Sequence, residues 1–173
     1  MKKIALALSV LGLTALAHAA DPLNGTVWKT IDDKTKQAKA LVKFTEQKNG
    51  TLTASIQGIL TPGEENACTK CEGPYKNKSL KGLTIVHGLK NAGGTSYDGG
   101  SILDPQTGKT YKLKGNIAAG GKKLELRGYI GVAALGRNQT WIRANYSHPT
   151  KKAEQLLGFF VFVMPLGHEL HLH

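Results

Sequence analysis

The residues best suited to chemistry are a pair of cysteines in the motif Cys68-Thr69-Lys70-Cys71. This spacing is typical of a redox site, of half a zinc site or of a disulfide. The chain has two cysteines in all, so a second pair that would complete a zinc site is absent, and the surrounding pattern lacks the strand–helix–strand unit of a thioredoxin-like site. An oxidising compartment favours a disulfide between Cys68 and Cys71, and the N-terminal sequence predicts export to one.

The C-terminal tail carries three histidines within the last six residues, His168, His171 and His173. Neutral imidazole is a good ligand for Zn²⁺, Ni²⁺ and Cu²⁺. In an extended tail His171 and His173 share a face, whereas in a helix His168 and His171 do. Metal binding by this tail is one hypothesis, and a solvated terminus without metal is the other.

Catalytic motifs are scarce in the rest of the chain. There is no Gly-x-Ser-x-Gly, no His-Glu-x-x-His and no phosphate-binding glycine loop. Asp98 and Asp104 are two acids in one region, but Asp104-Pro105-Gln106-Thr107-Gly108 is typical of a turn in which the aspartate accepts backbone N–H groups. We therefore predict a protein that is not an enzyme and has no cofactor.

The N-terminus has the pattern of a secretory signal peptide. Lys2 and Lys3 precede an uncharged apolar stretch over residues 4–17, and Ala17-His18-Ala19 is a small-x-small cleavage site. The stretch is shorter than the about 20 residues of a membrane-spanning helix. We expect residues 1–19 to be removed and residues 20–173 to form one domain in the periplasm or outside the cell.

The chain is basic, with 23 Lys and Arg against 12 Asp and Glu and a net charge of +11. The lysines are scattered, and the arginines (Arg127, Arg137 and Arg143) do not cluster with aromatic residues, so we expect no nucleic-acid partner. The charge favours a solvated surface, and weak contact with anionic lipid headgroups is the alternative.

Alternating apolar and polar residues predict a mostly β protein, with Asn49-Gly50 as a hairpin turn. Residues 61–79 predict a long loop, residues 80–89 are ambiguous, residues 147–158 predict a short helix and residues 159–164 a last strand. Outside these segments, the predicted strands span residues 26–31, 38–46, 52–60, 101–103, 111–117, 124–130 and 137–145. We favour an antiparallel closed barrel over a sandwich, because closure removes exposed sheet edges.

The apolar face of each strand must point into this barrel. Eight-stranded barrels are either filled by side chains or hold one small ligand. Small residues on that face, such as Ala40 and Gly115, favour a hollow barrel that binds a hydrophobic or amphipathic molecule. The alternative is a filled barrel that acts through a partner, a dimer formed by residues 159–164, or the histidine tail. The predicted lining residues are Val42, Phe44, Ala54, Ile56, Tyr111, Leu113 and Leu126.

Three multi-residue motifs, taken in their order along the chain, indicate a resemblance to a known family. They are Asp-Gly-Gly-Ser-Ile-Leu-Asp-Pro at residues 98–105, Leu-Glu-Leu-Arg-Gly-Tyr-Ile-Gly at residues 124–131 and Leu-Gly-Arg-Asn-Gln-Thr-Trp-Ile-Arg at residues 135–143. Over about residues 25–144 the chain resembles the exported bacterial family known as domain of unknown function 2147. The resemblance implies a lipocalin-like barrel, and it brings no assigned reaction.

The first strand departs from the pattern of lipocalins and of this family, which tend to carry Gly-x-Trp. Here two residues separate Gly25 from Trp28. The resemblance implies that Trp28 closes the base of the barrel beneath an arginine from a late strand, with Arg143 as the first candidate and Arg137 as the second. A guanidinium over an indole is a cation–π contact. An ordinary buried tryptophan with a surface arginine is the alternative.

Overall fold

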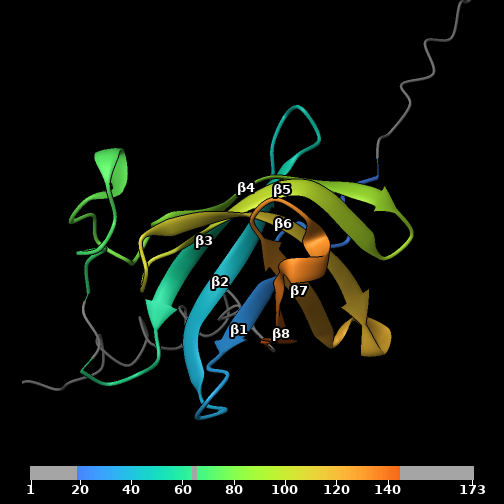
Figure 1. The fold of residues 1–173 in the computed structure, drawn as a ribbon. Helices are drawn as coiled ribbons and strands as arrows, with labels where there is room; N and C mark the ends of the chain where they lie inside the picture. The colour runs from blue at the N-terminus through green and yellow to red at the C-terminus, as the bar shows by residue number, and fades with distance from the viewer. Residues whose placement is uncertain (1–18, 64–65, 145–173) are drawn as a thin grey trace, which may run out of the picture.

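In the computed structural model, which describes residues 19–63 and 66–144, one antiparallel sheet wraps into a closed barrel (Figure 1). Eight strands follow one another round the sheet in chain order, and the first pairs with the last. The strands are β1 (Val27–Ile31), β2 (Ala38–Glu46), β3 (Leu52–Ile59), β4 (Thr84–Gly93), β5 (Ser96–Asp104), β6 (Lys109–Ala118), β7 (Lys123–Tyr129) and β8 (Arg137–Arg143). Three short 3₁₀ turns complete the described secondary structure: η1 (Gly73–Tyr75), η2 (Ala119–Gly121) and η3 (Ala133–Leu135).

The predicted alternation is confirmed where it was clearest. Over residues 40–44 of β2 and 52–56 of β3 every second side chain is buried, and the two strands pair across the Asn49-Gly50 turn. Inward residues come from both strands and meet those of the other strands inside the barrel. The period of two therefore separates the interior from the surface, as the sequence predicts.

The structure extends the prediction in the middle of the chain. Residues 84–89 of the ambiguous segment 80–89 form the first six of the ten residues of β4, and β5 is much longer than the predicted strand 101–103. Both strands carry exposed glycine and polar residues where they run into the β4–β5 turn, which masks the alternation there. The predicted helix 147–158 and last strand 159–164 lie outside the described residues, and the barrel closes through β1 and β8.

The two ends of the barrel differ. At one end, called the closed end below, the interior is filled by the fully buried rings of Trp28, Phe44 and Trp141. At the other, the open end, the chain forms the β1–β2, β3–β4, β5–β6 and β7–β8 connections. No helix in the described part of the chain has the length and hydropathy of a membrane-spanning segment.

Candidate ligand cavity

A cavity of about 420 Å³ occupies the open half of the barrel. Its deep walls are apolar and come from opposite sides of the barrel, among them Val42, Ile56, Ile85, Leu113 and Leu126. Its rim is polar and charged, and comprises Asp32, Asp33, Lys39, Asp104, Gln106 and Arg137, whereas Gln139 lies deeper, opposite Leu126 in the β7–β8 register. Within the described residues no buried side-chain nitrogen or oxygen lacks a hydrogen-bond partner. The deep cavity offers mainly apolar contact, with Gln139 as a polar group on its wall, and the charged groups lie at its mouth.

Five of the seven predicted lining residues border this cavity: Val42, Ile56, Tyr111, Leu113 and Leu126. Phe44 and Ala54 are equally buried but lie nearer the closed end, where they face each other across β2 and β3. There the Phe44 ring packs on Trp141, with 6.3 Å between ring centroids. Alternation identifies the inward face of a strand but not the depth of a residue along the barrel, so it did not separate cavity wall from filled core.

Trp28 and Arg143 meet at the base of the barrel. They are direct partners in the β1–β8 register, and the Arg143 guanidinium lies 5.7 Å from the indole centroid. The indole Nε1 donates a hydrogen bond of 2.7 Å to Thr26 Oγ1, which in turn donates to the Leu23 carbonyl at 2.6 Å. Arg137, the other candidate, lies at the opposite end of β8 on the cavity rim.

Sequence reasoning missed Asp21, which ties the N-terminal segment to the closed end. Its carboxylate accepts hydrogen bonds from the Tyr97 hydroxyl at 3.0 Å, from Asn91 Nδ2 at 3.2 Å and from the Leu23 amide at 2.8 Å. Burial, and then the Asp21 carboxylate beside it, raise the pKa of Tyr97 above its ordinary range. No local signal points to this cluster, because Asp21 and Tyr97 are 76 residues apart in the chain.

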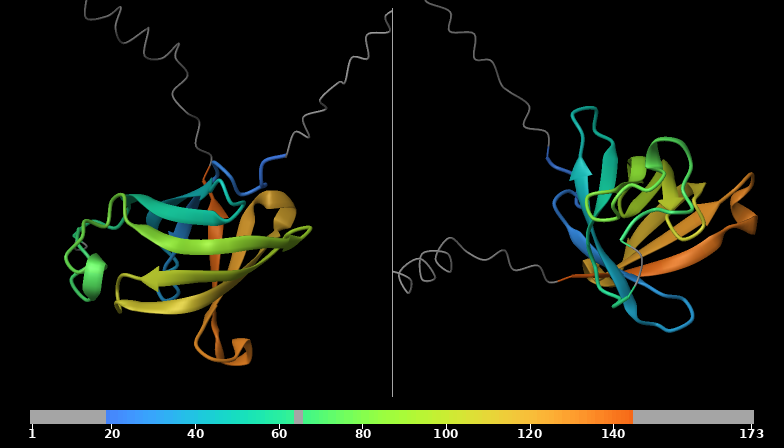
Figure 2. Two further views of the ribbon diagram at one scale, coloured as in Figure 1. Left: turned by 90° about the horizontal axis from the view of Figure 1, so that it is seen from above. Right: turned by 90° about the vertical axis from the view of Figure 1, so that its left-hand side faces the viewer.

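The β1–β8 seam of the barrel is short. The two strands pair at two positions near the closed end. Beyond these, Ile31 on one side and Gln139 on the other border the cavity, and the β1–β2 and β7–β8 hairpins diverge (Figure 2, right). The Arg137 guanidinium bridges the gap by donating to the Asp33 carboxylate, with Nε at 2.7 Å. This exposed ion pair thus joins the two hairpins at the rim of the cavity.

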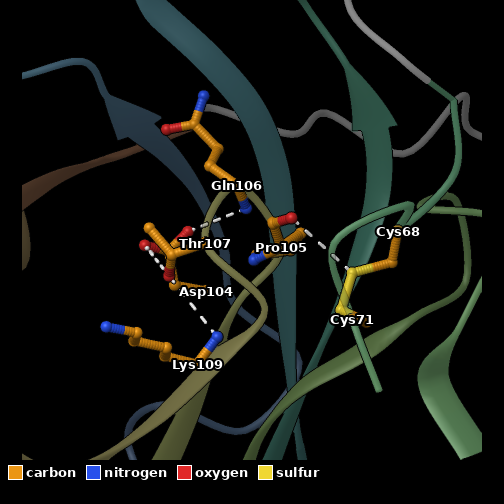
Figure 3. Close-up of a disulfide and its surroundings, with 7 residues drawn as sticks. All are labelled: Cys68, Cys71, Asp104, Pro105, Gln106, Thr107 and Lys109. Carbon is orange, nitrogen blue, oxygen red and sulfur yellow. Dashed lines mark hydrogen bonds between the residues drawn. A yellow bond between two sulfur atoms is a disulfide. The ribbon is translucent and has the colours of Figure 1, made fainter. Parts of the chain in front are cut away.

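The disulfide Cys68–Cys71 supports another part of the open end. Both cysteines are buried, and their Cα atoms are 5.3 Å apart. Cys68 Sγ lies 3.7 Å from the carbonyl oxygen of Pro105 in the β5–β6 turn (Figure 3). A Cβ atom added at Gly108 would lie 1.9 Å from the Lys70 carbonyl oxygen, so the turn and the disulfide loop are in direct contact.

The turn itself is built as its sequence predicts. The Asp104 carboxylate accepts hydrogen bonds from the Gln106 amide at 2.9 Å and from the Thr107 hydroxyl at 3.0 Å (Figure 3). Asp98 lies near the start of β5, and its carboxylate accepts a hydrogen bond from the Gly99 amide at 2.7 Å, at the register shift between Tyr97 and Gly100. Asp104 therefore serves a turn and Asp98 an irregularity within β5, and the two acids do not form a pair.

No group of three or more metal-ligating side chains occurs within residues 19–63 and 66–144. The predicted metal ligands His168, His171 and His173 lie outside these residues. Metal binding by the tail stays a prediction.

A closed barrel of eight antiparallel strands in chain order, with a cavity at one end and a tryptophan–arginine contact at the other, is a lipocalin-like barrel. The family model described as "Uncharacterized protein conserved in bacteria (DUF2147)" matches residues 26–143. The chain belongs to this family, which confirms the resemblance.

A solved structure with the same fold is described as "Protein HP1028 from the human pathogen Helicobacter pylori belongs to the lipocalin family". It matches with a TM-score of 0.62 and 24% sequence identity, over 78% of this chain and 88% of that chain. A search of curated proteins finds no match. The match to this solved structure confirms the lipocalin-like fold.

Proposed function

We propose that this protein binds a small amphipathic molecule, with the apolar part in the barrel cavity and the polar end at the rim. The observation that carries the proposal is the apolar cavity of about 420 Å³ behind a charged mouth. Ligand pockets in proteins commonly measure about 300–1,000 Å³ and combine apolar walls with a few polar groups. Burial of apolar ligand surface, at about 25 cal/mol per Å², drives binding before the costs of association are subtracted.

Binding outside the cytoplasm is part of the same proposal. The signal-peptide pattern of residues 1–19, a family described as bacterial and the Cys68–Cys71 disulfide all support export to the periplasm or beyond. A carrier of apolar molecules has a role there, because such molecules dissolve poorly in the aqueous space between membranes.

The test is titration of the protein with an apolar dye whose fluorescence rises on leaving water, followed by displacement with a fatty acid. Ala40→Trp fills the cavity from β2, because Ala40 borders it, and we expect dye affinity to fall at least about tenfold. Lys43→Trp adds the same ring to the outer face of β2 and serves as the matched control.

A second filling variant guards against loss of folding in the first. Gly128→Leu enters from β7, where an added Cβ atom would meet Tyr111 Cβ at an ordinary 3.5 Å. Circular dichroism checks that each variant is folded. If the folded wild type binds no apolar probe, or if both filling variants bind it as well as Lys43→Trp does, the proposed function is wrong.

A further inference from the structure

The β7–β8 loop, residues 130–136, projects apolar side chains into solvent at the cavity mouth. Ile130, Val132 and Leu135 are 65%, 61% and 83% exposed. Together they form the apolar lip, and Ile130 and Leu135 also border the cavity. Elsewhere in the described residues, the exposed large hydrophobic side chains are Leu60 and Ile142, at 41% and 36%. The apolar lip is thus the main concentration of exposed hydrophobic surface in the described structure.

The loop is held in this exposed conformation by Arg127. Its guanidinium donates from Nε to the Ala133 carbonyl at 2.6 Å, from Nη2 to the Ala134 carbonyl at 2.8 Å and from Nη1 to Asn138 Oδ1 at 2.7 Å. Gly136 lets the loop pass close to β7, since an added Cβ atom would lie 2.8 Å from the Gly128 carbonyl oxygen. Exposure of the lip is therefore built into the loop, and a fixed apolar surface in water marks an interaction site.

The charge beside the base of the lip, on β6 and β7, is positive, whereas the cavity rim that the lip borders also carries Asp32, Asp33 and Asp104. Residues 127–137 contain no acidic residue and have an arginine at each end, of which Arg137 is paired with Asp33. The partners of Arg127 in the loop are uncharged oxygens, so its charge is not neutralised there. Lys112 and Lys114 of β6 lie beside the base of the loop, opposite Tyr129 and Arg127 in the register. The next carboxylate along β7, Glu125, pairs with Asn116, one step closer to the closed end.

We propose that the apolar lip inserts into the surface of an anionic lipid membrane, with Arg127, Lys112 and Lys114 against the headgroups. A few apolar side chains beside basic charges suit reversible binding to such a surface. A single loop is too small for a stable protein interface, which needs about 800 Å² from each partner. The side of the cavity mouth that the lip forms then lies against the membrane, and an amphipathic ligand can pass between the cavity and the membrane. This transfer rests on the proposed function, whereas docking does not.

The experiment is co-sedimentation with vesicles of phosphatidylcholine, alone or with roughly a quarter phosphatidylglycerol. We expect binding to the anionic vesicles, weakened by added salt because salt screens the headgroup charge. The variant Ile130→Ser, Val132→Ser, Leu135→Ser should lower the partition coefficient at least about tenfold. Ile142→Ser, which removes an exposed apolar side chain from the outer face of β8, is the matched control and should bind as the wild type does.

Charge is tested separately. Lys112→Gln with Lys114→Gln should weaken binding to the anionic vesicles by about fivefold per lysine. Lys48→Gln with Lys90→Gln removes the same charge at and beside turns of the closed end and should have much less effect. All variants are expressed from the same full-length gene and their N-terminus is checked by intact mass, so any effect of the N-terminal segment is common to all.

Val132→Ser separates docking from ligand binding, because Val132 does not border the cavity. It should weaken vesicle binding and leave dye affinity unchanged. Equal binding to neutral and anionic vesicles, or no loss in the triple variant, overturns docking without touching the cavity. A lip-dependent dimer in sedimentation velocity without vesicle binding overturns it in favour of a second copy of the chain. Loss of dye binding with vesicle binding intact overturns the proposed function alone.

Discussion

The closed and open ends of this barrel are made from the same strands, but the interior is filled at the closed end and hollow at the open end. At the closed end the aromatic rings fill the interior, and Asp21 and Thr26 satisfy buried polar groups with hydrogen bonds. At the open end the same strands leave a cavity, and the loops expose apolar and charged side chains. We therefore expect the interactions that stabilise the folded state to be concentrated at the closed end, so that the open end can be shaped for ligand binding.

The largest expected effect is at the base of the barrel. Trp28→Ala removes a ring with no exposed surface and its contact with Arg143, and we expect the free energy of unfolding to fall by about 3–5 kcal/mol. Leu135→Ala, in the exposed lip, should change it by less than about 0.5 kcal/mol. Urea unfolding of both variants measures the difference between the two ends, and similar values would contradict the comparison.

The disulfide should give an intermediate effect. Cys68→Ser with Cys71→Ser should lower the unfolding free energy by about 2 kcal/mol, since the disulfide closes a very short loop of the unfolded chain. Because this loop packs on the β5–β6 turn at the cavity rim, we also expect weaker dye binding. Wild-type protein unfolded with a reductant is the control and should match the variant. Two freely alkylated thiols in the unreduced native protein would show that the disulfide does not form.

Tyr97 tests the hydrogen-bonded cluster of the closed end through pH. Tyr97→Phe removes a donor to the Asp21 carboxylate, and we expect a loss of about 1.5–3 kcal/mol at neutral pH. Since the folded protein raises the pKa of Tyr97 above its ordinary value of 10.0, the hydroxyl contributes stability below that pH. This contribution is lost as pH rises above it, because the unfolded chain ionises first.

The measurement is chemical unfolding of the wild type and Tyr97→Phe between neutral and alkaline pH. Lysine titration is common to both proteins, so the difference between the two curves isolates Tyr97. The difference should shrink as pH rises above 10.0. A difference that stays constant with pH would show that Tyr97 does not resist ionisation in the folded state.

The smallest expected effect on stability is at the Arg137–Asp33 ion pair between the β1–β2 and β7–β8 hairpins. Arg137 and Asp33 form an exposed pair, with side chains 67% and 33% exposed, so Arg137→Gln should cost less than about 0.5 kcal/mol. We nevertheless expect faster release of bound dye in stopped-flow displacement, because the pair joins the two hairpins at the cavity rim. A large loss of stability with unchanged release would place Arg137 among the structural residues of the barrel.

The sequence by itself determined the strands whose alternation is regular. In β2, β3, β6 and β7 the inward residues follow from a period of two, which each strand carries locally. The turn at Asp104 was equally readable, because an aspartate that accepts nearby backbone N–H groups needs no distant partner. Closure followed from the need to remove sheet edges, and the family motifs pointed to the same barrel.

Only the tertiary structure decided how deep each inward residue lies in the barrel, which residues face each other between strands, and which residues far apart in the chain pair. Phe44 and Val42 share one face of β2, yet only Val42 borders the cavity, because the aromatic residues of other strands fill the space beside Phe44. The choice of Arg143 over Arg137 depends on the β1–β8 register. Each of these features arises from contacts between strands far apart in the chain, where no local pattern of residue types can carry the information.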